Sequence, residues 1–197
     1  VAHYADFLKI ARSAFGPNSR DVALVYKGIA EIYHERSDHK MALSYLNQAL
    51  DTQRASRGGK FSKDVATTLN KLGNMCYEMK DYMSAMRHYQ EGVHEERTVL
   101  TTNHHHIIVT LTNIAHIYKQ LGEHTKALMT YKKVRKIQAK KSECQGGDSI
   151  QIAETLSSIG LMQYHMRDFE SAFDSYQEAL RIRRQHLGTD NHPDIAS

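Results

Sequence analysis

The chain has 197 residues, of which 41% are hydrophobic and 24% charged, and its formal net charge at pH 7 is +4. It contains no apolar run near the ~18 residues of a membrane span, and its first residues lack the charged-then-apolar layout of a signal peptide. Two cysteines, Cys76 and Cys144, are too few for a disulfide framework. These features exclude a membrane-inserted or disulfide-stapled class and predict a reduced, cytoplasmic chain.

Helix-forming residues are plentiful and Pro occurs only at Pro17 and Pro193, which predicts an all-α protein. Apolar residues at steps of three and four predict one helix near residues 1–15, followed by four helix pairs. The pairs are expected at 21–36 with 39–56, 64–79 with 82–100, 107–121 with 124–141, and 149–166 with 169–187. The segment 142–149 is the expected mobile loop. Glycines that can adopt a left-handed backbone are expected to end second helices at Gly58, Gly59, Gly146, Gly147 and Gly188.

The helix pairs repeat one another in sequence. A small residue of the first helix recurs at Ala30, Gly73, Ala115 and Gly160. An alanine of the second helix recurs at Ala42, Ala85, Ala127 and Ala172. In both sets, which we call columns, successive members lie 43, 42 and 45 residues apart. Two independent positions thus show the same variation in spacing from one repeat to the next. The chain is therefore predicted to be a tandem array in which small residues let paired helices approach closely.

An acidic residue stands at the start of each second helix. These residues are Asp38, Asp81, Glu123 and Asp168. A carboxylate at this place can accept hydrogen bonds from free backbone N–H groups and meets the positive end of the helix dipole. We therefore expect these side chains to cap the second helices.

The residues at the repeated positions resemble the tetratricopeptide repeat family. The family's bulky–Leu–small–aromatic order in the first helix reads here as Leu111, Ile114, Ala115 and Tyr118, and its Ala–aromatic–Ala order in the second helix as Ala172, Tyr176 and Ala179. The usual unit of the family has about 34 residues. Repeats of 42–45 residues, together with Leu-Gly at 187–188 and His-Pro-Asp at 192–194, resemble the kinesin light chain type instead. The resemblance implies a right-handed α-solenoid of antiparallel helix pairs that acts as an adaptor.

The expected organisation is one array over residues 1–197. Residues 1–20 align with the second helix of a repeat whose first helix is missing, and 194–197 match the start of a further repeat, so the chain resembles a piece of a longer array. Complete repeats are expected at 21–63, 64–106, 107–148 and 149–193.

In a right-handed stack of helix pairs, the first helices line the concave side. Their positions outside the apolar stripe are rich in Asn, Thr, Ser, His and Tyr, which offer hydrogen-bond donors and acceptors to a peptide backbone. The predicted peptide-binding groove consists of Lys27, Glu31, His34, Asn70, Lys71, Asn74, Tyr77, Thr112, Asn113, His116, Lys119, Glu154, Ser157, Leu161 and Tyr164.

Within this set, three asparagines are expected to anchor an extended or short helical peptide: Asn70, Asn74 and Asn113. The family resemblance supports two of them, because Asn70 and Asn113 match the two asparagines of the light-chain pattern Leu-Asn-Asn-Leu. Acidic residues of the partner are expected to meet Lys27, Lys71 and Lys119, and apolar contact is expected from Tyr77 and Tyr164.

No catalytic motif, phosphate-binding glycine loop or metal-ligand spacing was found, so neither an enzyme, a cofactor nor a metal is expected. The run His104–His106 is expected to be a solvated linker, since consecutive residues on a turn rarely converge on one ion.

Two alternatives to a peptide-binding scaffold stay open. The groove could be filled by the protein's own chain or by a second copy, which would make the array a self-assembling structure. A nucleic acid could bind a basic stripe on second helices, although solvated helices commonly carry such residues. That stripe comprises Lys132, Lys133, Arg135, Lys136, Lys140, Lys141, Arg181, Arg183 and Arg184.

Overall fold

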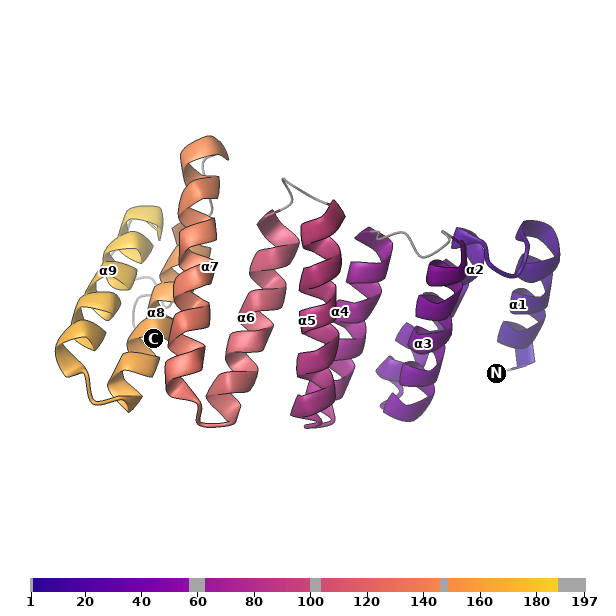
Figure 1. Ribbon diagram of the computed structural model, residues 1–197, viewed down its shortest axis with the longest axis horizontal. Helices are drawn as coiled ribbons and strands as arrows, with labels where there is room; N and C mark the ends of the chain where they lie inside the picture. The colour runs from indigo at the N-terminus through magenta and orange to yellow at the C-terminus, as the bar shows by residue number, and fades with distance from the viewer. Residues whose placement is uncertain (1, 57–62, 100–103, 146–148, 188–197) are drawn as a thin grey trace. The chain divides into compact units, whose positions relative to one another are not determined.

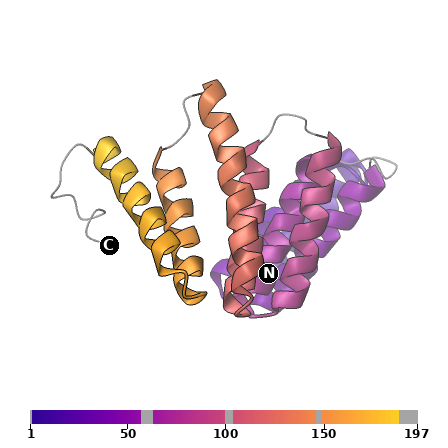
Figure 2. The same cartoon turned by 60° about the vertical axis from the view of Figure 1, so that its left-hand side comes forward.

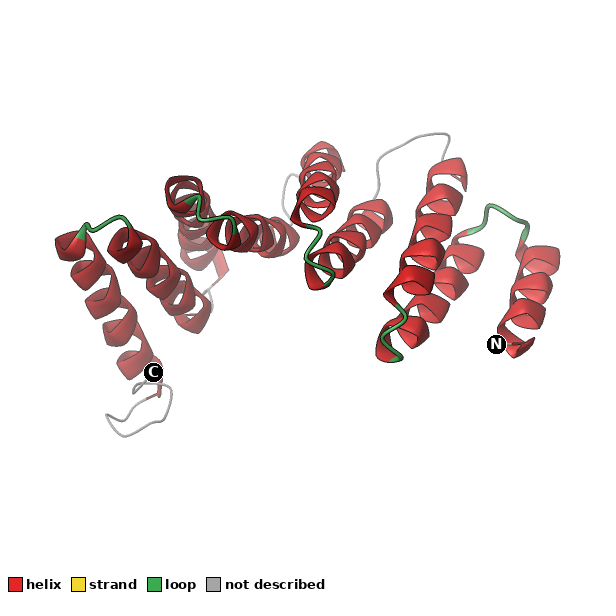
Figure 3. Cartoon of the chain, turned by 90° about the horizontal axis from the view of Figure 1, so that it is seen from below, coloured by secondary structure: helices red, strands yellow, loops and turns green. Residues whose placement is uncertain are grey.

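The computed structural model describes residues 2–56, 63–99, 104–145 and 149–187. Within these ranges the regular structure consists of nine α-helices and no strand (Figure 3). None of the described helices has the length and apolar character needed to cross a lipid bilayer. The chain divides into two compact units, an N-terminal unit (residues 1–103) and a C-terminal unit (residues 104–197), each of which is described separately.

The N-terminal unit contains five of the helices (Figure 1). They are α1 (Ala2–Phe15), α2 (Arg20–Glu35), α3 (His39–Ser56), α4 (Lys63–Glu78) and α5 (Tyr82–Val99). Helix α2 forms a hairpin with α3 and α4 forms one with α5, while α1 packs on α2 and α3 packs on α4. The predicted helix pairs are therefore observed, and their first helices start one residue earlier than expected.

The C-terminal unit contains the other four described helices. They are α6 (His104–Gln120), α7 (His124–Gln145), α8 (Ser149–His165) and α9 (Phe169–Leu187). Helices α6 and α7 form one hairpin, α8 and α9 form another, and α7 packs on α8. Figure 2, in which this unit comes forward, shows α7 extending past the end of α8.

Two sequence-based expectations about this unit are wrong. Residues Ser142–Gln145, expected in a mobile loop, continue α7, because no Gly or Pro interrupts the chain before Gly146. The run His104–His106, expected in a linker, forms the first turn of α6. The glycines expected to end second helices lie outside the described residues: Gly58, Gly59, Gly146, Gly147 and Gly188.

The small residues bring paired helices close together, as predicted. The alanine column of the second helices is buried in every hairpin. A Cβ atom added to Gly73 would lie 2.5 Å from the ring of Tyr89, and one added to Gly160 would lie 3.2 Å from the ring of Tyr176 and from the carbonyl oxygen of Ala172. Contacts this close leave no room for a larger residue at Gly73 unless Tyr89 moves.

The aromatic column of the second helices is buried unevenly. Tyr131 of α7 is only 1% exposed and belongs to a core cluster formed by α6, α7 and α8. Tyr176 of α9, at the same repeat position, is 40% exposed. The difference arises because α7 packs between α6 and α8, whereas α9 is the last described helix.

The turn inside each hairpin has the same backbone geometry. One residue per turn adopts a positive φ, and these residues are Ser37, Lys80, Gly122 and Arg167. The following residue donates its N–H five residues back, as from Asp81 to the Cys76 oxygen at 2.9 Å, which is the Schellman arrangement. The same aspartates then cap the second helices, since Asp38, Asp81 and Asp168 accept from the backbone N–H three residues ahead at 3.1–3.3 Å.

Candidate functional site

A first cavity lies between α2 and α4 in the N-terminal unit, toward the C-terminal ends of these helices. Its volume is about 250 Å³. Ala30, Leu46 and Met75 supply its apolar part. Four residues of the predicted groove line it, and they are Glu31, His34, Lys71 and Asn74. This cavity therefore brings together four predicted groove residues from two consecutive first helices.

The polar side chains of this first cavity already have partners. Glu31 and Lys71 form an ion pair between α2 and α4. His34 Nε2 lies 2.7 Å from the carboxylate of Glu78, and the Asn74 side-chain oxygen accepts a hydrogen bond of 2.6 Å from Tyr89. Lys71, which was expected to meet an acidic partner, thus already has a carboxylate beside it.

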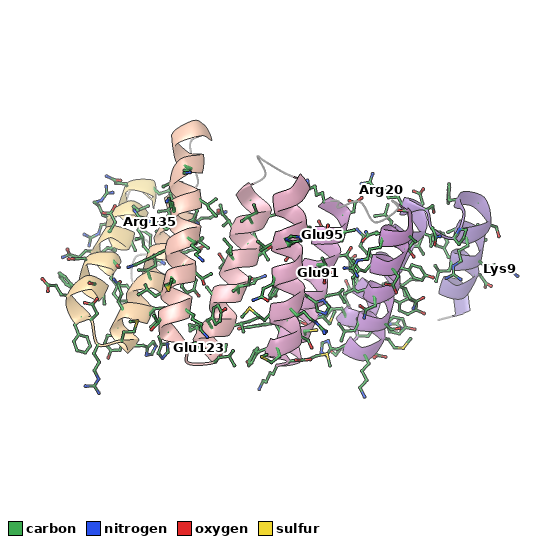
Figure 4. All side chains as sticks on the ribbon, in the orientation of Figure 1. Lys9, Arg20, Glu91, Glu95, Glu123 and Arg135 are labelled. Carbon is green, nitrogen blue, oxygen red and sulfur yellow. The ribbon has the colours of Figure 1, made fainter. Side chains whose placement is uncertain are left out.

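A further ion pair joins the opposite ends of α2 and α4. Arg20, labelled in Figure 4, lies 3.0 Å from Asp64. Lys27 lies between this pair and the cavity, and burial lowers its pKa, an effect that Asp64 opposes and Lys71 reinforces. The groups facing one another between α2 and α4 thus carry both signs of charge.

Two other predicted residues of this unit point elsewhere. The Asn70 side-chain oxygen lies 3.5 Å from where a Cβ atom on Gly92 would be, so it faces α5. The ring of Tyr77 packs against that of Tyr82, with ring centroids 5.5 Å apart. Asn70 and Tyr77 therefore contribute to packing between α4 and α5.

A second cavity, of about 190 Å³, lies between α6 and α8 in the C-terminal unit, toward the N-terminal ends of these helices. Three residues of the predicted groove line it: Thr112, Asn113 and Glu154. The Thr112 hydroxyl donates to the Ile108 carbonyl oxygen at 2.8 Å, which leaves the oxygen of this hydroxyl able to accept.

Gln138 of α7 adds an unsatisfied acceptor to the second cavity. It is 6% exposed, and its side-chain NH₂ group donates to the Gln151 carbonyl oxygen at 3.3 Å. Its side-chain oxygen is buried and has no hydrogen-bond partner among the described residues. A buried acceptor of this kind is costly unless a ligand or water donates to it.

The imidazole of His116 was expected in the groove but packs edge-on against Tyr131, with ring centroids 5.9 Å apart. Burial lowers the pKa of His116, and the nearby positive charge of Lys119 lowers it further. Lys119 itself is partly exposed near the end of α6.

The remaining predicted residues lie on α8 and do not line the second cavity. The hydroxyl of Ser157 donates to the Ala153 carbonyl oxygen at 3.0 Å. Leu161 packs against the core of this unit. Tyr164 is exposed, and its ring contacts that of Phe169 at 5.6 Å.

Sequence reasoning missed Glu78, Gln138 and Gln151, all of which line cavities. Glu78 follows Lys71 and Asn74 on one helical face at steps of three and four, so its position could have been found. Gln138 occupies the same repeat column as Gln53, another buried glutamine, which accepts a hydrogen bond of 2.9 Å from Thr68 on the next helix. A glutamine that recurs at the same position of two repeats was therefore the sequence signal that could have identified Gln138.

The basic stripe on α7 and α9 is largely solvent-facing. The side chains of Lys132, Lys133, Lys136 and Lys140 are exposed, and Arg135, labelled in Figure 4, is half-buried. Arg181 pairs with Glu178 at 2.7 Å on its own helix. The α7 aromatic, Tyr131, is buried and offers no stacking surface, whereas Tyr176 of α9 is half-exposed, so only the α7 part of the stripe lacks the aromatic platform of a nucleic-acid site.

Comparison with known proteins identifies the repeat and the fold. The family model described as Tetratricopeptide repeat matches residues 1–55, 64–140 and 107–185. No curated protein matches the chain. The described helices and their structural similarity to solved repeat proteins show an all-α helical-repeat solenoid, which confirms the predicted fold class.

Three solved structures illustrate the similarity. BtubC (BKLC) from P. vanneervenii has a TM-score of 0.81 and 20% identity, covering 96% of this chain and 74% of that chain. A Podosopora anserina putative kinesin light chain with nearly identical TPR-like repeats has a TM-score of 0.75 and 13% identity, covering 94% and 86%. MamA has a TM-score of 0.66 and 15% identity, covering 92% and 86%. Identities this low show a shared fold alone.

Proposed function

We propose, because the chain belongs to the tetratricopeptide repeat family, that it is a non-catalytic scaffold which binds a peptide segment of a partner protein. Proteins of this family are typically scaffolds for protein–protein interaction and are generally non-catalytic. The peptide-binding surfaces we assign are those that the first helices form within each unit, with the second cavity as the main contact.

The observation that carries this proposal is the unsatisfied oxygen of Gln138 in the second cavity. The side chains around it are mostly neutral and polar, and Asn113 can both donate and accept. A peptide N–H donated to Gln138 would satisfy a buried acceptor, so binding would remove a cost that the unbound chain carries.

Partner charge is the second element of the proposal. We retain the expectation of acidic residues in the partner, to be met by Lys119 in the C-terminal unit and by Lys27 and Lys71 in the N-terminal unit. Lys71 already pairs with Glu31, but the Lys71 side chain is 37% exposed and that of Glu31 is 60% exposed. Because an exposed ion pair contributes only about 0–1 kcal/mol, a carboxylate of the partner could replace Glu31 at small cost.

The adaptor role and the repeat subtype are also proposals. Repeats of 42–45 residues and the fold shared with a putative kinesin light chain support a kinesin-light-chain-like adaptor that joins a cargo to other machinery. The buried free thiol of Cys76 is compatible with the reduced cytoplasm we propose for it. The proposed activity requires no cofactor.

Peptide selection tests the proposed function. A display library of random short peptides would be selected against the chain, and the affinity of a selected peptide measured by calorimetry for the wild type and for Asn113→Ala. We expect this variant to weaken binding about 5- to 150-fold, equivalent to about 1–3 kcal/mol for a partner group left unpaired.

Asn47→Ala is the matched control, since Asn47 is an exposed asparagine on the second helix α3, and it should bind as the wild type does. Equal affinity of Asn113→Ala and the wild type, or failure to select any peptide, would refute the assignment. Light scattering over a concentration series would reveal a second copy as the occupant instead.

A further inference from the structure

Three potential metal ligands converge in the N-terminal unit. His34, His39 and Glu78 each place one ligand atom so that all three atoms lie within 4.8 Å of one another. His34 is in the last turn of α2, His39 is the first residue of α3, and Glu78 is the last residue of α4. Three separate helices thus contribute one side chain each.

Short-range structure holds these side chains in place. The turn from α2 to α3 is fixed by hydrogen bonds from Ser37 to the His34 oxygen and from Asp38 to the Tyr33 oxygen, at 2.8 and 2.9 Å. His34 Nε2 lies 2.7 Å from Glu78 Oε2, and the rings of His34 and His39 lie 5.9 Å apart. The Nδ1 atom of His39 is buried and has no hydrogen-bond partner among the described residues.

We propose that His34, His39 and Glu78 bind a Zn²⁺ ion. Two imidazole nitrogens and one carboxylate oxygen are donors that zinc accepts, whereas Mg²⁺ and Ca²⁺ favour oxygen ligands. Bonds of about 2.0–2.2 Å around a tetrahedral ion place ligand atoms about 3.3 Å apart. Side-chain rotation achieves this spacing, because the side chains of His34 and Glu78 are 42% and 45% exposed.

The C-terminal unit provides a natural comparison for this site. At the corresponding place, His124 begins α7 and stacks on His165 of α8, with ring centroids 4.7 Å apart. Lys119, rather than a histidine, stands there at the position of His34, and its positive charge opposes a cation. Among the described residues, no second group of three His, Cys, Asp or Glu ligands approaches as closely.

A bound ion would link the α2–α3 hairpin to α4, and three protein ligands leave one coordination position open to water. Because His34 and Glu78 also line the first cavity, the ion would lie at the edge of that cavity. The site does not depend on the proposed peptide function, since its ligands all belong to this chain.

Zinc titration of the chelator-treated full chain tests the proposal, with calorimetry and competition against a chromogenic zinc indicator as readouts. We expect one ion per chain, a higher melting temperature with zinc, and no response to Mg²⁺. His39→Ala and Glu78→Gln should each weaken zinc binding roughly tenfold or more and abolish the thermal shift. Circular dichroism would verify that both variants remain helical, and Glu78 is exposed, so its variant should fold.

His105→Ala is the control, because His105 is an exposed histidine in the first turn of α6 and lies outside the proposed site. It should bind zinc as the wild type does. Unchanged zinc binding in His39→Ala and Glu78→Gln, or a loss of binding in His105→Ala alone, would overturn the proposal.

Discussion

The first cavity, between α2 and α4, and the second, between α6 and α8, both lie between consecutive first helices, but their polar groups are satisfied differently. In the first cavity, Glu31 forms an ion pair with Lys71, and His34 Nε2 lies within hydrogen-bonding distance of the Glu78 carboxylate. In the second, the Gln138 oxygen has no partner among the described residues. The repeat fold thus creates a cavity between consecutive first helices in each unit. The individual side chains that line the cavity determine whether its polar groups already have partners or lack one that a ligand could supply.

The largest difference between the units should appear in the packing beneath these surfaces. Gly73→Ala would place a Cβ atom 2.5 Å from the buried ring of Tyr89, whereas Gly160→Ala meets the half-exposed Tyr176 at 3.2 Å. We expect Gly73→Ala to lower the free energy of unfolding by about 1–3 kcal/mol through overpacking. Gly160→Ala should change it by less than about 1 kcal/mol, because Tyr176 and the Ala172 carbonyl oxygen, both at 3.2 Å, need to move by only a few tenths of an ångström and alanine favours the helix.

Denaturant unfolding would measure both effects, and native-state hydrogen exchange would assign them to one unit or the other. Equal losses in the two variants would contradict the packing difference between the units.

Helix capping gives the next largest effect. Asp81 in the N-terminal unit accepts a backbone hydrogen bond from Ser84, whereas Glu123 in the C-terminal unit, labelled in Figure 4, pairs with Lys126 at 2.5 Å. Asp81→Ala should therefore cost about 1 kcal/mol and Asp81→Asn much less, because asparagine also caps helices. Glu123→Ala should cost less than Asp81→Ala, as measured by thermal unfolding. The reverse order would show that capping is not the source of the difference.

The same cap predicts a pH dependence. Hydrogen bonds from the side chain and backbone of Ser84 lower the pKa of Asp81 below its ordinary value of 3.8. A lowered pKa means that the folded state favours the ionised carboxylate, so this stabilisation is complete above about pH 5 and is lost as the pH falls below 3.8. The melting temperature of Asp81→Asn should accordingly fall less between pH 5 and pH 3 than that of the wild type. If the melting temperatures of the two proteins fell equally with pH, Asp81 would not contribute to the loss of stability in acid.

The smallest effects concern the turn residues with positive φ. Lys80 in the N-terminal unit has φ +61°, and Gly122 in the C-terminal unit has φ +72°. Because glycine adopts this conformation without the steric cost of a Cβ atom, Lys80→Gly should stabilise its unit by about 0.5–1 kcal/mol. Gly122→Ala should destabilise its unit by about 1 kcal/mol. Chemical denaturation would measure the free energy of unfolding of both variants, which should rise in Lys80→Gly and fall in Gly122→Ala. A change in the same direction in both variants would contradict this explanation.

Features fixed by neighbours in sequence could be predicted. The columns at 43-, 42- and 45-residue steps predicted every described hairpin, and the acidic starts of second helices predicted the caps at Asp38, Asp81 and Asp168. Local hydrogen bonding and the helical period determine both. The last four residues of α7, 142–145, were predicted in a loop. They continue the helix because this segment contains no Gly or Pro before Gly146.

The candidate site was less predictable, because it depends on how successive hairpins pack. Seven predicted groove residues line the two cavities: Glu31, His34, Lys71, Asn74, Thr112, Asn113 and Glu154. Residue type alone could not show that Lys71 would pair with Glu31, or that Asn70 would face α5. The convergence of His34, His39 and Glu78 likewise requires the packing of three helices.

The central claim is that the second cavity contains a buried acceptor, the Gln138 side-chain oxygen, that a peptide N–H satisfies on binding, whereas the polar side chains of the first cavity pair with one another. The most direct test is the affinity of a library-selected peptide for Gln138→Met, which keeps the side-chain length but removes the amide, beside Lys71→Ala. We expect a loss of affinity of about tenfold or more for Gln138→Met and of less than about threefold for Lys71→Ala. Wild-type affinity in Gln138→Met, or an equal loss in Lys71→Ala, would contradict this claim.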